Sequence, residues 1–272
     1  MSKKSASYSS RRTRPSSDTS WESIAQDYNQ AVDREGHFYH KEVILPNLLS
    51  QLHLSPESSL VDIGCGQGIL EKHLPKKLPY LGIDLSPSLL RFAKKSASSR
   101  SRQFLHHDMM LPLPATHCNS FSHAVAILSL QNMESPERAI AHTAQLLAPQ
   151  GRMFIVLNHP CFRIPRLSSW LYDEPKKLLS RKIDRYLSPL TIPIVAHPGE
   201  KLSEKTYSFH FPLSYWVQAL SKHNLLIDGM EEWISPKTSS GKRARAENLC
   251  RKEFPLFLFI SALKKDNSKS SF

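Results

Sequence analysis

The segment Val61–Gly68 constrains the fold of this chain more than any other. It reads Val-Asp-Ile-Gly-Cys-Gly-Gln-Gly and continues the apolar run that begins at Leu60. A short apolar run that ends in glycines predicts a buried strand followed by a tight turn, and glycine lets the backbone approach a ligand closely. The helix expected after Gly68 would point its first amides at the same place. This segment therefore predicts a ligand-binding crevice at the end of a strand.

Strands and helices are expected to alternate through the first part of the chain. Apolar runs predict strands at 58–63, 80–84, 102–107, 121–130 and 152–157. Helices are expected at 21–28, 38–51, 68–73, 86–98 and 136–147, and the third of these stops at a proline. Alternation of this kind predicts a parallel sheet with helices on both faces.

The rhythm breaks after residue 157. Residues 163–206 are rich in proline and charge, and we expect an inserted cap there with one short helix near 176–186. A helix at 213–223 precedes two last strands, 225–233 and 254–264, which a basic loop at 236–252 should join. Two consecutive strands without a helix between them predict an antiparallel edge hairpin. The expected fold is thus an α/β fold with a seven-stranded, mostly parallel sheet and such a hairpin.

Excess positive charge is concentrated near the ends of the chain. The net charge is +12 over 272 residues. Residues 1–19 are basic and serine-rich and are expected to be a disordered tail, as are residues 266–272. A basic surface permits binding to nucleic acid, but basic tails and loops can equally be solvated charge.

The spacing of the cysteines and the length of the apolar stretches indicate where in the cell the protein is expected. The four cysteines are scattered and no two have C-x-x-C spacing, so we expect neither a metal site nor a redox pair. No apolar stretch is long enough to span a bilayer, and the first residues lack the apolar core of a signal peptide. A cytoplasmic protein without a membrane span is expected.

Three acidic residues each follow one of the first three expected strands. They are Asp62, Asp84 and Asp108. The carboxyl ends of neighbouring parallel strands meet at one crevice, where open α/β sheets bind ligands. We therefore expect these three carboxylates to converge.

The glycine loop alone does not decide between two nucleotide cofactors. A dinucleotide site also places an acid about 20 residues after its first glycine, as Asp84 lies after Gly64. Here, however, the third glycine is displaced and followed by Ile69, and Asp62 precedes the loop where a pyrophosphate would be repelled. Asp108 suits an exocyclic amine as hydrogen-bond donor. A ligand with an amino group, a sulfonium, a ribose diol and an adenine amine fits all three acids, and S-adenosylmethionine is such a ligand.

Four segments carry a resemblance to a known family. They are Val61–Gly68, Gly82–Ser86, His107–Pro112 and Leu146–Arg152. Residues 60–160 resemble the class I S-adenosylmethionine-dependent methyltransferase domain, of the type that acts on small molecules. The resemblance implies a Rossmann-like domain over residues 20–265, with the cap 163–206 and the basic loop 236–252 as insertions. It also implies an enzyme that transfers a methyl group from S-adenosylmethionine.

The family pattern assigns cofactor contacts to individual residues. Gly64 and Gly66 would contact the methionine part, Asp84 the ribose hydroxyls, and Asp108 the adenine amine with Met109 packing on the ring. The full set of expected cofactor contacts is Tyr28, Asp62, Gly64, Cys65, Gly66, Asp84, Leu85, Asp108, Met109 and Leu128. For Cys65, a small packed residue is the alternative role.

The acceptor side is less defined, because the segment Leu128–Asn132 lacks the His or Trp often found there in the family. His159 after the fifth strand is the candidate general base, with a purely structural histidine as the alternative. The functional hypothesis is a methyltransferase with a small-molecule acceptor. The alternatives are an RNA or protein methyltransferase that docks through its basic tails, and a non-catalytic binder of S-adenosylmethionine. The oligomeric state stays open.

Overall fold

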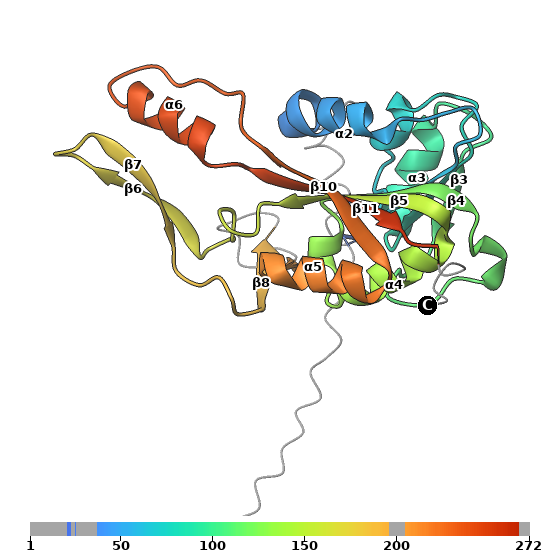
Figure 1. The fold of residues 1–272 in the computed structure, drawn as a ribbon. Coiled ribbons are helices and arrows are strands. Elements are labelled where there is room, and N and C mark those ends of the chain that lie inside the picture. Colours follow the sequence, from blue (N-terminus) through green and yellow to red (C-terminus); the bar gives the residue numbers. More distant parts are fainter. Residues whose placement is uncertain (1–20, 23–24, 26–36, 196–204, 267–272) are drawn as a thin grey trace, which may run out of the picture.

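The computed structural model describes residues 21–22, 25, 37–195 and 205–266. Figure 1 shows a body built on one large sheet and an arm that extends from it. The tails predicted at 1–19 and 266–272 lie outside the described residues, apart from Asp266.

The large sheet has seven strands in the order β10-β11-β5-β4-β1-β2-β3. Neighbours from β5 to β3 pair in parallel, and β11 runs antiparallel to both β5 and β10. The strands are β1 (Leu60–Ile63), β2 (Tyr80–Asp84), β3 (Gln103–His106), β4 (Phe121–Ile127), β5 (Leu147–Asn158), β10 (Leu225–Trp233) and β11 (Phe257–Lys264). The predicted seven-stranded, mostly parallel sheet with an edge hairpin is confirmed.

Helices cover both faces of this sheet, as predicted. In Figure 1, α2 and α3 lie on one face and α4 and α5 on the other. The α-helices of the body are α2 (Leu45–Leu52), α3 (Pro87–Ser96), α4 (Pro136–Leu146) and α5 (Leu213–Lys222). Shorter turns are η1 (His40–Ile44), η2 (Leu70–His73), η3 (Ala115–His117) and η4 (Leu130–Asn132).

Strand β5 contributes side chains to two apolar cores, one on each face of the sheet. Its side chains alternate between the faces, as the pleat of a strand requires. Met153 and Ile155 pack into the core beneath α4 and α5, whereas Phe154 and Val156 pack into the core beneath α2. Because both faces are covered, the strand is a nearly continuous apolar run, which is why the sequence identifies it.

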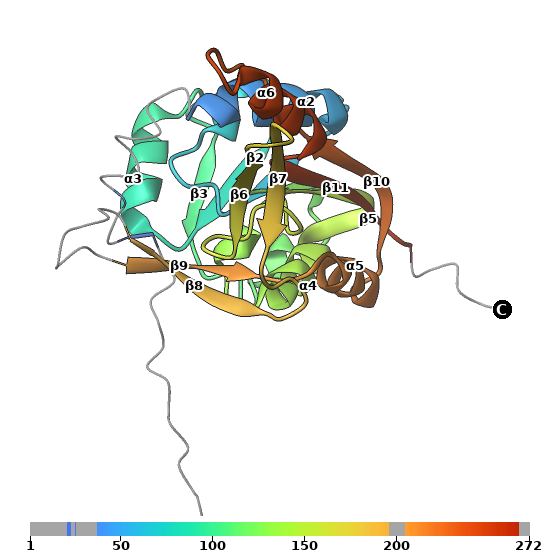
Figure 2. The ribbon, with the colours of Figure 1, turned by 90° about the vertical axis from the view of Figure 1, so that its left-hand side faces the viewer.

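The insertion 163–206 forms two hairpins instead of the expected short helix. Strands β6 (Ser168–Asp173) and β7 (Leu178–Ile183) pair with each other, and so do β8 (Leu190–Val195) and β9 (Lys205–His210). The helix predicted near 176–186 is wrong, because alternating residues of β7 are exposed and half-buried, with period two. Figure 2 shows β8 and β9 side by side along the lower edge of the body.

The predicted basic loop 236–252 contains a helix, α6 (Ala244–Glu253). Its residues are mostly strong helix formers, and this propensity outweighs their high charge. Ala246 and Cys250, one turn apart, are buried, and the Cys250 thiol donates to the Leu179 carbonyl of β7 (Sγ···O 2.7 Å). The helix therefore rests on the β6–β7 hairpin, and together they make the arm in Figure 1.

A buried ion pair ties η2 to the segment before β3. The Arg102 guanidinium donates to Glu71 Oε1 at 2.7 Å, and the two side chains are 0% and 1% exposed. Arg102 also donates to the carbonyls of Leu74, Leu78 and Pro75, and Glu71 accepts from the Ser98 amide. Each charge is therefore compensated by groups that only this fold brings together.

The substitution Glu71→Gln is expected to lower the free energy of unfolding by about 3–5 kcal/mol, because it leaves the buried Arg102 cation without its counter-charge. Urea denaturation at neutral pH measures this. The control is Asp184→Asn, which breaks the exposed pair with Lys182 (59% and 41% exposed) and should cost less than about 1 kcal/mol. Equal losses in the two variants would contradict the argument.

Candidate functional site

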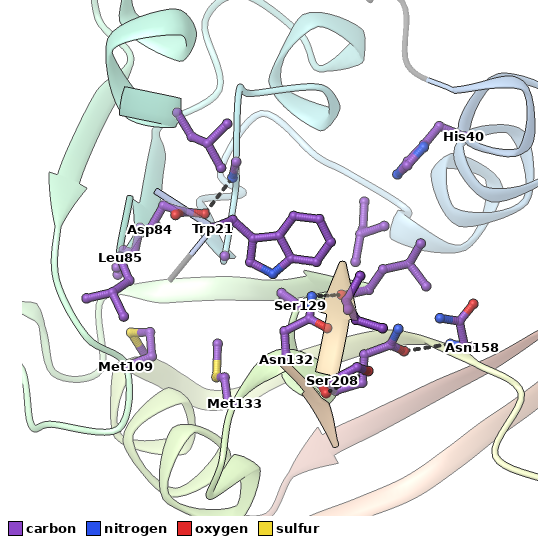
Figure 3. Close-up of a pocket in the computed structure, with 18 of the residues that line it drawn as sticks. Trp21, His40, Asp84, Leu85, Met109, Ser129, Asn132, Met133, Asn158 and Ser208 are labelled. Carbon is purple, nitrogen blue, oxygen red and sulfur yellow. Dashed lines mark hydrogen bonds between the residues drawn. The ribbon is translucent and has the colours of Figure 1, made fainter. Parts of the chain in front are cut away.

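A cavity of about 540 Å³ opens at the carboxyl ends of β1, β2 and β4. This volume lies in the range usual for small-molecule sites. One part is lined by residues of the predicted cofactor site, namely Gly64, Gly66, Asp84, Leu85, Asp108, Met109 and Leu128. The other part is lined by residues that follow β4 and β5 and by the β8–β9 hairpin (Figure 3).

Asp84 is the best-fixed acid in the cavity. One carboxylate oxygen accepts from the Gly66 amide and the other from the Ser86 amide, each at 2.8 Å. Burial raises the pKa of Asp84, and these backbone hydrogen bonds oppose the shift. The carboxylate thus joins the glycine loop to the start of α3 and keeps unused lone pairs for a ligand.

The glycine loop has the conformation that its composition predicts. Gly64 has a φ of +70°, and a Cβ there would lie 2.4 Å from Cβ of Ser129. Ser129 in turn donates to the Ile63 carbonyl at 2.6 Å. At Gly66 (φ +55°) a Cβ would meet nothing within 4 Å. Gly64 is therefore required for packing against Ser129, just after β4, whereas Gly66 faces open space where a ligand can approach.

Asp62 and Cys65 lie behind the cavity, and neither is among its lining residues. Asp62 is 2% exposed and accepts a hydrogen bond from the Tyr80 hydroxyl at 2.9 Å. Burial raises the pKa of Asp62 to about 7; Tyr80 opposes this shift and the charge of Asp84 adds to it. Cys65 is buried, and its thiol donates to the Gly66 carbonyl. Both residues support the loop from beneath.

Asp108 and Met109 continue the cofactor end of the cavity. Asp108 follows β3, and its carboxylate accepts from the Met110 amide at 2.8 Å, which fixes its direction. Met109 is 3% exposed and lines the wall, where Figure 3 shows its side chain below Leu85. Leu128, after β4, has a φ of +53°. The structure thus brings Asp84 and Asp108 to one cavity, as the strand-end argument predicts.

Trp21 and Glu22 close the cofactor end from the N-terminal side. The Glu22 carboxylate accepts from both the amide and the hydroxyl of Ser88 and from the Ser86 hydroxyl, at the first turn of α3. Partial burial raises the pKa of Glu22, but these hydrogen bonds outweigh it and hold that pKa below its usual value. Figure 3 shows the indole of Trp21 extending from beside Asp84 toward Ser129.

The far part of the cavity carries uncharged polar groups and a cation. Asn132, Asn158 and Ser208 line it, and the Gln131 side chain accepts from the Asn158 amide at 2.7 Å (Figure 3). Arg163 is the cation. Sequence reasoning missed these groups; Asn132, Asn158 and Arg163 lie at or after the ends of β4 and β5, which is a weak signal, and Ser208 on β9 has no such signal.

His159 is not among the residues that line the cavity. It is 2% exposed, Nδ1 accepts from the Cys161 amide at 3.2 Å, and Nε2 lies 2.6 Å from Glu232. Burial lowers its pKa, with Glu232 opposing. Its carbonyl also accepts from the Arg163 amide at 2.8 Å. The geometry favours the structural alternative, in which His159 holds the turn that carries Arg163.

His40 lies at the cavity wall and was not predicted (Figure 3). Its Nδ1 is buried and has no hydrogen-bond partner among the described residues. Burial and the neighbouring His37 lower its pKa to about 4, so the ring is neutral near pH 7. Tyr28, a predicted contact, lies outside the described residues.

Comparison with known proteins identifies the segment that builds the cofactor end. Residues 61–155 match the family described as "Methyltransferase domain". An uncharacterized methyltransferase of Mycobacterium bovis is 28% identical over 117 residues, which are 41% of this chain and 58% of that protein. A ubiquinone biosynthesis O-methyltransferase of Coxiella burnetii is 27% identical over 96 residues, 35% of this chain and 41% of that protein. The chain thus spans less than two thirds of either relative.

A solved structure extends the similarity beyond the matched segment. The S-adenosylmethionine-dependent methyltransferase from Mesorhizobium loti is 26% identical, and the alignment covers 80% of this chain and 96% of that one with a TM-score of 0.63. The residues that build the cofactor end of the cavity, from Gly64 to Leu128, fall within the matched range 61–155. Arg163 and Ser208 fall outside it.

The raised pKa of Asp62 predicts a pH-dependent stability difference. Between about pH 4 and pH 7 the folded protein holds a proton on Asp62 that the unfolded chain releases. The contribution of Asp62 to the free energy of unfolding is therefore fully present at low pH and is lost as the pH rises to about 7. Asp62→Asn keeps a partner for Tyr80 and does not titrate. Its free energy of unfolding relative to the wild type should therefore rise across this range and then level off. Parallel pH profiles from urea denaturation would refute the assignment.

Proposed function

We propose that this chain transfers a methyl group to a small-molecule acceptor, which is held in the far part of the cavity that binds the cofactor. The premise is that the chain carries a class I S-adenosylmethionine-dependent methyltransferase domain. The observation that carries the proposal is the continuity of the cavity. One volume of about 540 Å³ is lined both by the acids of the cofactor end and by Asn132, Asn158 and Ser208.

The residues of the cofactor end fit S-adenosylmethionine. Gly66 leaves open space at the backbone, which suits close contact with the methionine part. The carboxylate of Asp84, oriented by two backbone amides, suits the two ribose hydroxyls, and Asp108 suits the adenine amine. Met109 and Leu85 supply an apolar surface for the adenine ring.

When bound, S-adenosylmethionine supplies a methyl group on a positively charged sulfur that leaves as a neutral thioether. The main task of the protein is alignment, which can account for roughly 7–11 kcal/mol of barrier lowering. Asn132 is fixed by its hydrogen bond to the Leu128 carbonyl (3.1 Å), and the Asn158 backbone by Gln131. The Asn132 side chain and the backbone of Asn158 therefore stand at defined positions beside the space for the acceptor.

The β8–β9 hairpin supports a small acceptor. Ile194 and Ser208 on this hairpin line the cavity, and the Ser208 hydroxyl donates to the Gln131 carbonyl at 3.3 Å. A cover built this way limits the acceptor to a molecule that fits inside and helps to exclude water. A relative acts in ubiquinone biosynthesis according to its name, which agrees with an acceptor of this class.

The basic segment 236–252 gives less support to the alternative of nucleic-acid docking. Lys237 stacks on Phe38 and Tyr39, Arg243 pairs with Glu174 and stacks on Tyr172, and Arg251 donates to Ser239 and Asn248. These three basic side chains therefore make contacts within the protein, which leaves them less available to a nucleic acid.

We also propose a cytoplasmic location. Its support is that Cys65, Cys118, Cys161 and Cys250 are all free thiols. In the described part of the chain, no helix combines the length and apolar character needed to cross a bilayer.

Salt dependence separates the two kinds of acceptor. With a small acceptor, turnover should change little between about 50 mM and 200 mM salt, because few counterions are released on binding. A fall of about a thousandfold over this range would favour a nucleic-acid acceptor instead. Methyl transfer from labelled cofactor into a whole-cell extract that contains both metabolites and nucleic acid, read at several salt concentrations, provides the measurement.

The substitution Asp84→Asn should weaken S-adenosylmethionine binding about tenfold or more, since it replaces charged hydrogen bonds to the ribose with neutral ones. Isothermal titration calorimetry on the full chain measures the affinity, and the unfolding temperature reports whether the fold is retained. Asp173→Asn, on the arm, is the matched control and should bind like the wild type. Absence of binding by the wild-type chain would overturn the proposed function, and unchanged affinity in Asp84→Asn would overturn the ribose assignment.

A further inference from the structure

Arg163 is a cation in the cavity wall without a counter-charge among the described residues. Its side chain lines the cavity at the end away from Asp84 and Asp108. The guanidinium carbon lies 5.2 Å from the ring centroid of Phe257, and no described side chain or carbonyl accepts a hydrogen bond from it. Burial lowers its pKa, with Tyr39 opposing and Arg181 adding to the shift. An arginine stays charged even so, because its ordinary pKa is very high.

Other arginines near the core have the partners that Arg163 lacks. Arg102 is paired with Glu71. Arg181 donates to the Phe162 carbonyl at 2.7 Å and to Ser168, and it stacks on Trp170. A guanidinium removed from water without hydrogen-bond acceptors is costly. Arg163 is half-buried, has no such acceptor among the described residues and faces the cavity.

The charges divide the cavity into two ends. Both acids that line it, Asp84 and Asp108, lie at the cofactor end, and the described residues place no carboxylate among the lining residues beside Arg163. The acidic end suits a cofactor that carries positive charge. The end with Arg163 suits a molecule that carries negative charge.

Polar groups and apolar surface complete the space around Arg163. His40, whose ring is neutral near pH 7, lines this space, and so does Asn158. Pro165, Ile194 and Phe257 provide apolar surface between these groups. An occupant of this space would have an apolar body, one anionic group and a further hydrogen-bonding group.

We propose that the methyl acceptor is an apolar carboxylic acid whose carboxylate is bound by Arg163. The proposal rests on the proposed function, which it deepens by naming the class of acceptor. The planar guanidinium offers a pair of parallel N–H donors that match the two oxygens of a carboxylate. A single guanidinium balances one negative charge, which suits a carboxylate better than a phosphate dianion.

Binding of two matched pairs of ligands tests the proposal on the full chain. The acids are benzoate and octanoate, and the controls are their uncharged amides, benzamide and octanamide. Affinities are measured by calorimetry with and without saturating S-adenosylhomocysteine, and S-adenosylmethionine binding is measured separately. The wild type should bind at least one acid about tenfold more tightly than its amide, as expected for a hydrogen-bonded charge.

Two substitutions at Arg163 separate charge from geometry. Arg163→Gln should abolish the preference for the acid over the amide, while Arg163→Lys should keep part of it, because the charge remains but the fork is lost. Arg245→Gln is the matched control, since that side chain is exposed on α6 and does not line the cavity, and it should keep the full preference. Unfolding temperatures show which variants are folded.

The remaining outcomes contradict either the role of Arg163 or the proposed function. If neither acid is preferred over its amide by the wild type, or if Arg163→Gln keeps the preference, Arg163 does not bind a carboxylate of the acceptor. If S-adenosylmethionine affinity falls in Arg163→Gln as it does in Asp84→Asn, Arg163 holds the carboxylate of the cofactor instead. Failure of the wild type to bind S-adenosylmethionine overturns the proposed function, and the acid preference without cofactor then reports on the Arg163 site alone.

Discussion

The carboxylate of Asp84 holds the cofactor end of this molecule together. Its two oxygens bind the amides of Gly66 and Ser86, so one side chain fixes the glycine loop after β1 and the start of α3 after β2. Glu22 then binds the same first turn of α3 and brings Trp21 over the cavity. A carboxylate at a helix N-terminus is stabilised by the amides there, which lets two acids lie close to one helix start. The cavity wall depends on this short chain of hydrogen bonds.

Much of the fold was predictable because its centre follows simple rules. Buried parallel strands are apolar runs, so β1, β2, β4 and β5 were visible in the sequence. Asp84 and Asp108 were predictable because acids at the ends of neighbouring parallel strands converge. Local chemistry and global topology agree at these positions.

The arm and the acceptor end were not predictable for different reasons. Strand β7 and helix α6 stabilise each other across a long stretch of sequence, through Cys250 and the Leu179 carbonyl, and neither has an apolar pattern of its own. Arg163 lies against Phe257, the first residue of the last strand, and nothing local to Arg163 indicates that neighbour. His159 looked catalytic because of its residue type, yet both of its ring nitrogens are engaged within the fold. Residue type alone therefore did not separate the two roles proposed for the histidine, and it gave no signal for the arginine whose amide the His159 carbonyl binds.

The place of β11 in the sheet has a consequence for how the chain is made. Strand β10 pairs with the sheet only through β11, which lies between β10 and β5 and follows both in the chain. During synthesis, β10 and α5 therefore emerge before the strand that attaches them, and the outer edge of β5 waits unpaired. Exposed strand edges favour association between chains. A chain truncated between residues 233 and 257 would thus keep the parallel strands but leave the edge of β5 open, so β11 is the strand that closes the sheet.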